Sequence, residues 1–193
     1  VSTIAPSSIL KSINLDNDID VEKYPFEDMS EHWGKLTAYD MYKKGMFVGE
    51  TTFDGERLFF PERNITKAEF CTVLARALDL DTKPICSFDD SDVTLNNEFE
   101  NVPDWARPSV LALHKENYIQ PLLTNDEDGQ IVFNYDEHIT RMDVIRVFGN
   151  ILSNMISVTS ENIDQVFFTD FIAESENDID FLNAVYDKGI IKG

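Results

Sequence analysis

The stretches NITKAEF (residues 64–70) and HITRMDV (residues 138–144) share Ile-Thr, then a cation, then an acid two positions later. In each stretch the threonine, Thr66 or Thr140, stands three residues before the acid. This spacing is typical of a capping box, in which the hydroxyl accepts a backbone N–H and the acid accepts the N–H of the cap residue. Both stretches therefore predict the start of a helix. The apolar residues that follow at spacings of three and four make each helix amphipathic.

The repetition extends well beyond this motif. DGERLFFPERNITKAEF (54–70) aligns without a gap with DGQIVFNYDEHITRMDV (128–144). Upstream, WGKLTAYDMYKKGMFVG (33–49) matches WARPSVLALHKENYIQP (105–121), and NDIDFLNAVYDKGIIKG (177–193) resembles both. Internal similarity of this kind is typical of repeat proteins. The chain therefore contains two full copies of one unit and the first half of a third.

The first half of each unit predicts a short helix. Apolar residues recur at spacings of three and four, and each pattern ends at Gly45, Asn117 or Gly189. Glycine and asparagine are the residues that best tolerate the left-handed backbone with which helices often end. We therefore expect three short helices, each closed by a left-handed residue.

Composition restricts the class of function. The chain has 193 residues and a formal charge of -20, from 36 acids against 16 bases, and it contains no basic patch. Such a negative field disfavours nucleic acids and anionic membrane surfaces as partners. No apolar run approaches the 18 residues of a membrane span, and the N-terminal residues do not resemble a signal peptide. We expect a soluble chain that is either cytosolic or a mature piece of an exported protein.

The sequence carries no catalytic or metal-binding pattern. The three histidines are scattered, and GxSxG, HExxH and P-loop spacings do not occur. We therefore expect no enzyme activity, no metal and no cofactor. Cys71 and Cys86 form no CxxC pair. Two interpretations of them stay open: buried free thiols, or a disulfide that closes the short loop between them and stabilises the fold by about 3 kcal/mol.

Lys67 and Arg141 occupy the first helical position after each cap. A cation is unfavourable there, because the helix dipole already places partial positive charge at this end. One explanation is an ordinary surface ion pair with a nearby acid. The other is an anion site, in which the free N–H groups, the dipole and the cation converge on a carboxylate or phosphate.

The ordered motifs Phe-x-Asp, Trp, Gly-Ile-Ile-x-Gly, Asp-Gly, Phe-x-Pro and Ile-Thr-Lys/Arg-x-Glu/Asp resemble those of S-layer homology (SLH) repeats over residues 25 to 193. The resemblance implies a mostly α fold, with helix-loop-helix repeats packed as a pseudo-threefold helical prism and the third repeat incomplete. It divides the chain into a leader or linker segment (1–24), repeat 1 (25–82), repeat 2 with an acidic insertion (83–160) and the first half of repeat 3 (161–193).

The resemblance also implies a function. SLH modules are non-catalytic and hold larger surface proteins on the bacterial cell wall, outside the cell, by binding an acidic and often pyruvylated secondary cell wall polysaccharide in grooves between repeats. Transferred to this chain, the ligand-binding positions are Lys67, Arg141, Asp28, Asp90, Trp33, Trp105, Gly55 and Gly129. Structural roles for the same residues stay open: the tryptophans as core anchors, the aspartates as helix caps and the glycines as turn residues.

The sequence also departs from the family pattern. Lysine replaces arginine at position 67, Asn117 and Pro121 replace both glycines of the second unit, and Asn177 replaces the third tryptophan. The cation-bearing half of a third repeat is not present in this sequence. A second hypothesis is therefore a structural or protein–protein interaction module that keeps the scaffold without binding glycan. The leader could be the end of a linker, or it could fill the place of the missing helix.

Overall fold

The computed structural model describes residues 24–80, 82, 99–155, 168, 171–175 and 177–191. Within these residues the chain is mostly helical, as the sequence predicts. The α-helices are α1 (Lys35–Lys43), α2 (Lys67–Ala77), α4 (Arg107–Lys115), α5 (Arg141–Met155) and α6 (Asn177–Asp187). Two short 3₁₀ helices, η3 (Glu27–Met29) and η5 (Gln120–Leu122), accompany them.

In each of the first two units, a small antiparallel hairpin lies between the first and the second helix. One pairs β1 (Glu50–Thr51) with β2 (Arg57–Leu58), and the other pairs β3 (Thr124–Asn125) with β4 (Ile131–Val132). The registers correspond, because Glu50 faces Leu58 and Thr124 faces Val132. The gapless alignment of the two sequence blocks thus matches two hairpins of the same geometry.

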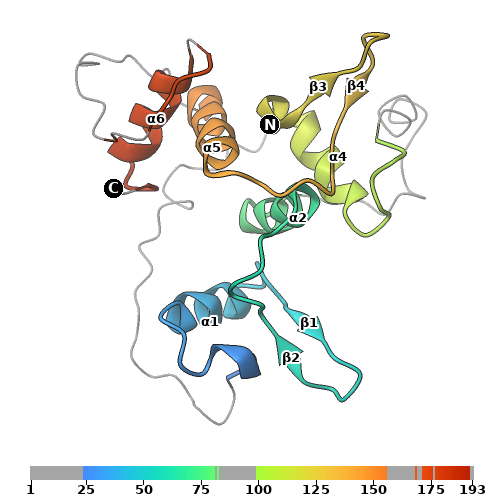
Figure 1. Cartoon of the computed structure of the whole chain (residues 1–193), viewed down its shortest axis with the longest axis vertical. Helices are drawn as coiled ribbons and strands as arrows, with labels where there is room; N and C mark the ends of the chain where they lie inside the picture. Colours follow the sequence, from blue (N-terminus) through green and yellow to red (C-terminus); the bar gives the residue numbers. More distant parts are fainter. Residues whose placement is uncertain are drawn as a thin grey trace.

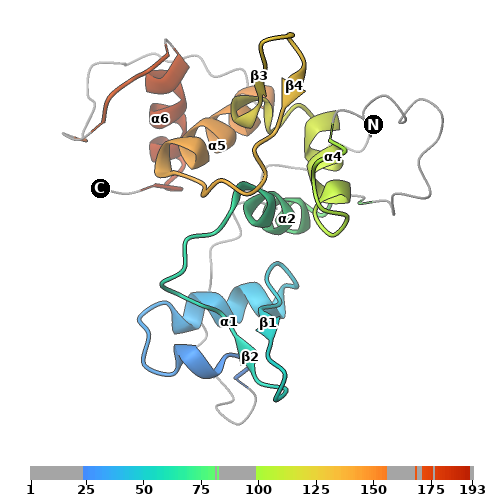
Figure 2. The same ribbon diagram turned by 45° about the vertical axis from the view of Figure 1, so that its right-hand side comes forward.

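The units form three lobes around two helices (Figures 1 and 2). One lobe holds α1 with hairpin β1–β2, the second holds α4 with hairpin β3–β4, and the third holds α6. Helix α2 packs against α4, and α5 packs against α6. The second helix of each unit therefore packs on the first helix of the next unit.

The same ring contact recurs in all three units. A phenylalanine that precedes the first helix meets, edge to face, a ring near the end of that helix, with centroid distances of 5.1 to 6.0 Å: Phe26 with Tyr42, Phe99 with His114, and Phe168 with Tyr186. Edge-to-face packing is a favoured geometry for aromatic pairs. The third unit therefore shares the local packing of the other two, although it has lost the tryptophan.

The three predicted left-handed helix ends are confirmed. Gly45, Asn117 and Gly189 have φ values of +69°, +59° and +68°. Each donates its backbone N–H, over 2.8 to 2.9 Å, to the carbonyl three residues earlier. A side chain with a Cβ is strained at such φ values, and asparagine tolerates them best after glycine. This explains how Asn117 can replace the glycine of the other units.

The main core lies between α2, α4, η5 and α5. Its fully buried members include Cys71, Phe99, Val110, Ile119 and Phe133. Cys71 is a buried free thiol, and burial raises its pKa to about 12. It is therefore protonated and unreactive at neutral pH. Cys86 lies outside the described residues.

A buried ion pair joins α5 to α6. The Arg146 guanidinium donates to both carboxylate oxygens of Asp178 over 2.8 Å, and Asp178 is completely buried. The Asp178 carboxylate also accepts the backbone N–H groups of Glu174 and Ser175. All of the carboxylate's hydrogen-bonding directions are thus used to fix the start of α6.

Candidate functional site

The start of α2 forms as the sequence predicts, but its N–H groups are occupied. Thr66 and Glu69 make a reciprocal capping box. The backbone N–H of Lys67 donates to the Glu137 carbonyl over 2.8 Å, and that of Ala68 donates to the Tyr135 carbonyl over 3.0 Å. The segment that leads into α5 therefore covers this helix end, and the free N–H groups that an anion site requires are not available there.

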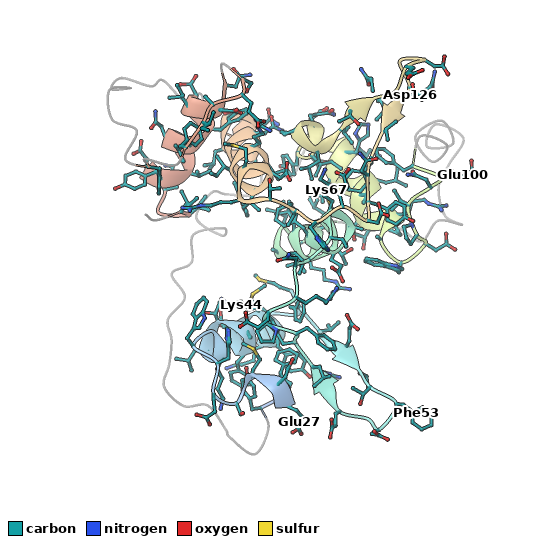
Figure 3. The ribbon with its side chains drawn as sticks, viewed as in Figure 1. Glu27, Lys44, Phe53, Lys67, Glu100 and Asp126 are labelled. Carbon is teal, nitrogen blue, oxygen red and sulfur yellow. The ribbon has the colours of Figure 1, made fainter. Side chains whose placement is uncertain are left out.

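Lys67 forms an internal ion pair. Its ammonium lies 2.6 Å from the Glu137 carboxylate, and its side chain is only 12% exposed. Figure 3 shows Lys67 in the middle of the molecule, near the chain that runs into α5. Of the two explanations for a cation at this position, the structure supports the ion pair for Lys67. This pair links the first unit to the second.

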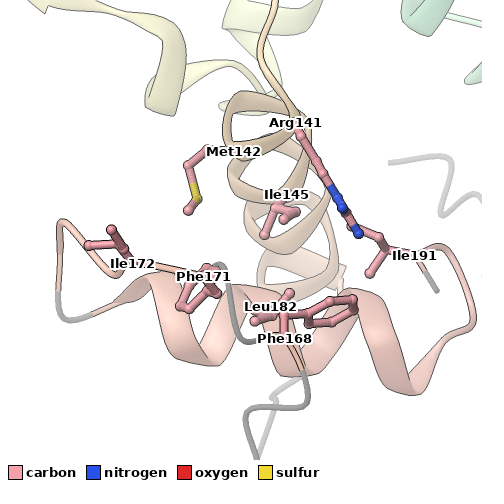
Figure 4. Close-up of a pocket in the computed structure, with 8 residues that line it drawn as sticks. All are labelled: Arg141, Met142, Ile145, Phe168, Phe171, Ile172, Leu182 and Ile191. Atoms are coloured by element: carbon pink, nitrogen blue, oxygen red, sulfur yellow. The ribbon is translucent and has the colours of Figure 1, made fainter. Parts of the chain in front are cut away.

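Arg141 occupies the corresponding place at the start of α5, in different surroundings. Its guanidinium carbon lies 5.3 Å from the centre of the Phe168 ring, which is a cation–π distance. Arg141, Met142 and Ile145 from α5 face Phe168, Phe171 and Leu182 across a pocket of about 270 Å³ (Figure 4). Apart from Arg141, every side chain that lines this pocket is apolar.

Asp28 has a structural partner. Its carboxylate accepts the N–H groups of Phe59 and Phe60, which follow β2, at distances of 2.6 to 3.2 Å. Asp90 lies outside the described residues. In the second unit Asn101 holds the corresponding place, because its amide donates to the carbonyl of Phe133, the counterpart of Phe59. This contact favours Asn101, rather than the predicted Asp90, as the counterpart of Asp28.

The two tryptophans are on the surface. Trp33 is 90% exposed and Trp105 is 57% exposed, so neither anchors a core. Gly55 and Gly129 lie in the hairpin turns with φ values of +87° and +77°. Neither glycine lines the two cavities described for this part of the chain. Of these four predicted residues, only Trp105 lines either of these two cavities.

That cavity is a cleft between the first and second units, with a volume of about 470 Å³. Trp105 forms the wall that the second unit contributes. The rest of the wall comes from α2 and from the lobe of α1 and hairpin β1–β2. The apolar lining consists of Met41, Phe47, Val48, Phe59, Phe60, Pro61, Ile65 and Val73. Its charged lining consists of Arg63, Arg76, Glu50 and Glu69.

The two arginines differ in their partners. Arg63 lies 3.0 Å from Glu50 and 2.9 Å from Glu69, and the hydrogen bond to Glu69 raises the pKa of the guanidinium. Arg76, on the exposed side of α2, forms no ion pair within the residues that the structure describes. Sequence reasoning missed both, because the repeat gives no signal for them: their counterparts in the second unit are Glu137 and Asn150.

The cleft thus combines an exposed indole face, apolar walls and one arginine without a described counter-charge. Such a surface can hold a flat, partly apolar ligand that carries an anion.

No group of three or more metal-ligating side chains occurs among the described residues. In the same part of the chain, no helix has the length and apolar character needed to cross a membrane. Neither known protein families nor curated proteins give a match to this chain in sequence comparisons.

Proposed function

We propose that the chain is a non-catalytic module of an extracellular bacterial surface protein, and that it binds an acidic glycan of the cell wall in the cleft between its first and second units. The observation that carries the proposal is the exposed Trp105 ring at a cleft that also contains Arg76. The ordered motifs of the sequence, which resemble SLH repeats, support the same class of ligand.

Trp105 supplies the surface for a sugar ring. The flat faces of an indole cover the C–H groups of a pyranose well, and burying this apolar area releases water. Trp105 is 57% exposed, so its ring is already placed at the cleft wall and accessible to a ligand. The surrounding Phe60 and Pro61 extend the apolar wall.

Arg76 supplies the positive charge for the acidic group of the glycan. Arg63 is already compensated by Glu50 and Glu69, and Lys67 is paired with Glu137. A guanidinium can bind a carboxylate through two parallel hydrogen bonds. We therefore assign the anion-binding role in this cleft to Arg76 rather than to Lys67.

The proposal includes a pseudo-threefold arrangement of the units. Three lobes surround α2 and α5, and each of these helices packs on the first helix of the next unit. In a closed ring the same contact would occur a third time, between a helix from the third unit and α1. Grooves then lie between neighbouring lobes, and the cleft at Trp105 is one of them.

The test is a pull-down with purified cell-wall sacculi, before and after removal of the secondary polysaccharide. We expect binding that disappears with the polysaccharide. Trp105→Ala should weaken binding about 2- to 10-fold, in line with a stacking contribution of about 0.5–1.5 kcal/mol. Arg76→Gln should weaken it further for pyruvylated than for unpyruvylated wall fragments, because only the former carry the carboxylate.

Trp33→Ala is the matched control. It removes an even more exposed tryptophan that lines neither described cavity. Binding that survives removal of the polysaccharide would contradict the glycan proposal. It would favour the second candidate, a protein-binding module whose net charge of -20 attracts a basic partner.

A further inference from the structure

The apolar pocket at the start of α5 has a filled counterpart elsewhere in the same molecule. Ala68 and Cys71 on α2 occupy the positions of Met142 and Ile145 on α5, and Phe99 occupies that of Phe168. At α2 the space between these residues is solid core. At α5 it is a cavity of about 270 Å³ (Figure 4).

The chain that fills the α2 site is the extended segment at 133–138. Phe133 is completely buried beside Phe99, at a ring distance of 6.2 Å, and Tyr135 packs against the same cluster. Ala68 and Lys67 donate their N–H groups to carbonyls of this segment. Thr66 and His138 form an isolated antiparallel bridge that continues the contact.

At α5 the corresponding backbone donor has no such partner among the residues that the structure describes. Met142 stands where Ala68 stands, and its N–H makes no hydrogen bond within the residues that the structure describes. The α5 site therefore has the donor and the apolar walls of the α2 site, without an occupant among the described residues.

A segment of the leader matches the occupant of the α2 site. INLDNDID (13–20) aligns without a gap with FNYDEHIT (133–140): Asn, Asp and Ile are identical at the second, fourth and seventh positions. The two apolar positions keep their spacing, with Ile13 and Leu15 in place of the larger Phe133 and Tyr135. The socket changes in the opposite sense, because Met142 and Ile145 are larger than Ala68 and Cys71. The two changes are thus complementary in direction, which favours close packing of the segment against the socket.

We propose that residues 13–19 of the leader occupy the pocket at the start of α5 in the same chain. Ile13 and Leu15 fill the apolar cavity, and the Leu15 carbonyl accepts the Met142 N–H, as the Tyr135 carbonyl accepts the Ala68 N–H. The leader thereby contributes to the third unit a segment that corresponds to residues 133–139 of the second unit.

A short connection joins the docked segment to the first unit. Arg141, which directly follows the segment 133–140, lies against Phe168 of the next unit. In the proposed docking, residues 16–23 connect Leu15 to Tyr24, the first residue that the structure describes, and this connection can span about 30 Å when extended. This step rests on the pseudo-threefold arrangement proposed above, and not on the binding of glycan.

Photo-crosslinking in the full chain tests the proposal directly. With p-benzoylphenylalanine in place of Leu15, irradiation should give an intrachain crosslink to Met142, Ile145 or Leu182, located by peptide mass spectrometry. The matched control carries the same probe at Leu10, which lies outside the matching segment, and it should not label these residues. Labelling elsewhere only, or a crosslinked dimer, would overturn the proposal.

Hydrogen exchange gives an independent readout. We expect Leu15→Asp to increase the exchange rate of the Met142 amide by about tenfold or more, because a charged residue expels the segment and exposes the donor. Leu10→Asp should leave the rate unchanged, and circular dichroism should show an intact fold in both variants. An unchanged Met142 rate in Leu15→Asp would refute the docking. Trp105→Ala should not affect the crosslink, so failure of glycan binding and failure of leader docking are separable.

Discussion

At the scale of single residues, the pair of Arg146 with the buried Asp178 is a charge-assisted contact that joins α5 to α6. We predict that Asp178→Asn lowers the free energy of unfolding by about 3 kcal/mol, because it removes the buried counter-charge of the guanidinium and leaves only the exposed Glu174 as its partner. Urea denaturation at pH 7 measures the change. Asp180→Asn, at an exposed position in the same first turn of α6, is the control and should cost less than about 1 kcal/mol.

The same pair predicts a pH dependence. The hydrogen bond from Arg146 holds the pKa of Asp178 well below its usual value of 3.8, although desolvation opposes this shift. A depressed carboxyl pKa contributes stability that is complete above the unfolded-state value and is lost as the pH falls towards the folded-state value. The difference in stability between the wild type and Asp178→Asn should therefore shrink as the pH is lowered below about 4. A difference that stays constant down to pH 2.5 would refute this assignment.

The start of α2 shows how far single residues can be predicted. The capping box of Thr66 and Glu69 is confirmed, because both partners lie within one turn and their spacing fixes the contact. The partner of Lys67 could not be predicted, because Glu137 is distant in sequence and the chain offers 36 acids. The exposed Arg76 at the cleft was missed for a related reason: the repeat marks shared residues, and Arg76 has no charged counterpart.

At the scale of elements, α5 and α6 approach closely at Gly149. A Cβ at this position would lie 2.7 Å from the Phe181 Cα and 2.6 Å from its Cγ. We predict that Gly149→Ala destabilises the protein by about 1–3 kcal/mol, because backbone atoms must move, although alanine favours a helix by about 1 kcal/mol. Thermal unfolding measures the effect.

Ser153→Ala, one turn further along α5, is the control for helix propensity. Its hydroxyl donates to the Gly149 carbonyl within the helix, a bond that slightly weakens helices. This variant should be neutral or slightly more stable. A Gly149→Ala variant that is also more stable would show that α5 and α6 are not in close contact at this point.

The elements themselves were largely predictable. The three short helices and their left-handed ends are confirmed, because periodicity and the end residues are local signals. Which helices pack against each other was harder to predict from the sequence. Helix α2 packs on α4 and α5 packs on α6, and this partner choice depends on the shape of apolar surfaces rather than on motifs. The cleft at Trp105 arises from this pairing and could not be located from the sequence.

At the scale of the whole molecule, charge repulsion opposes folding. A net charge of -20 on 193 residues favours expansion of the chain, and salt screens repulsion between exposed charges over about 10 Å at 0.1 M ionic strength. The buried pair of Arg146 and Asp178 is screened much less. We therefore predict that the protein becomes more stable as NaCl rises from 10 to about 300 mM. A gain of about 1 kcal/mol would raise Tm by about 2–4 °C for a chain of this size.

Differential scanning calorimetry at constant pH measures this effect, with KCl in parallel to separate screening from binding of a specific cation. Equal shifts in both salts support general screening. A fall of Tm with salt would show that attractive surface pairs, such as Arg63 with Glu50 and Lys44 with Asp40, outweigh the repulsion. The same titration bears on ligand binding, because a contact between Arg76 and an acidic glycan should weaken over the salt range in which the fold becomes more stable.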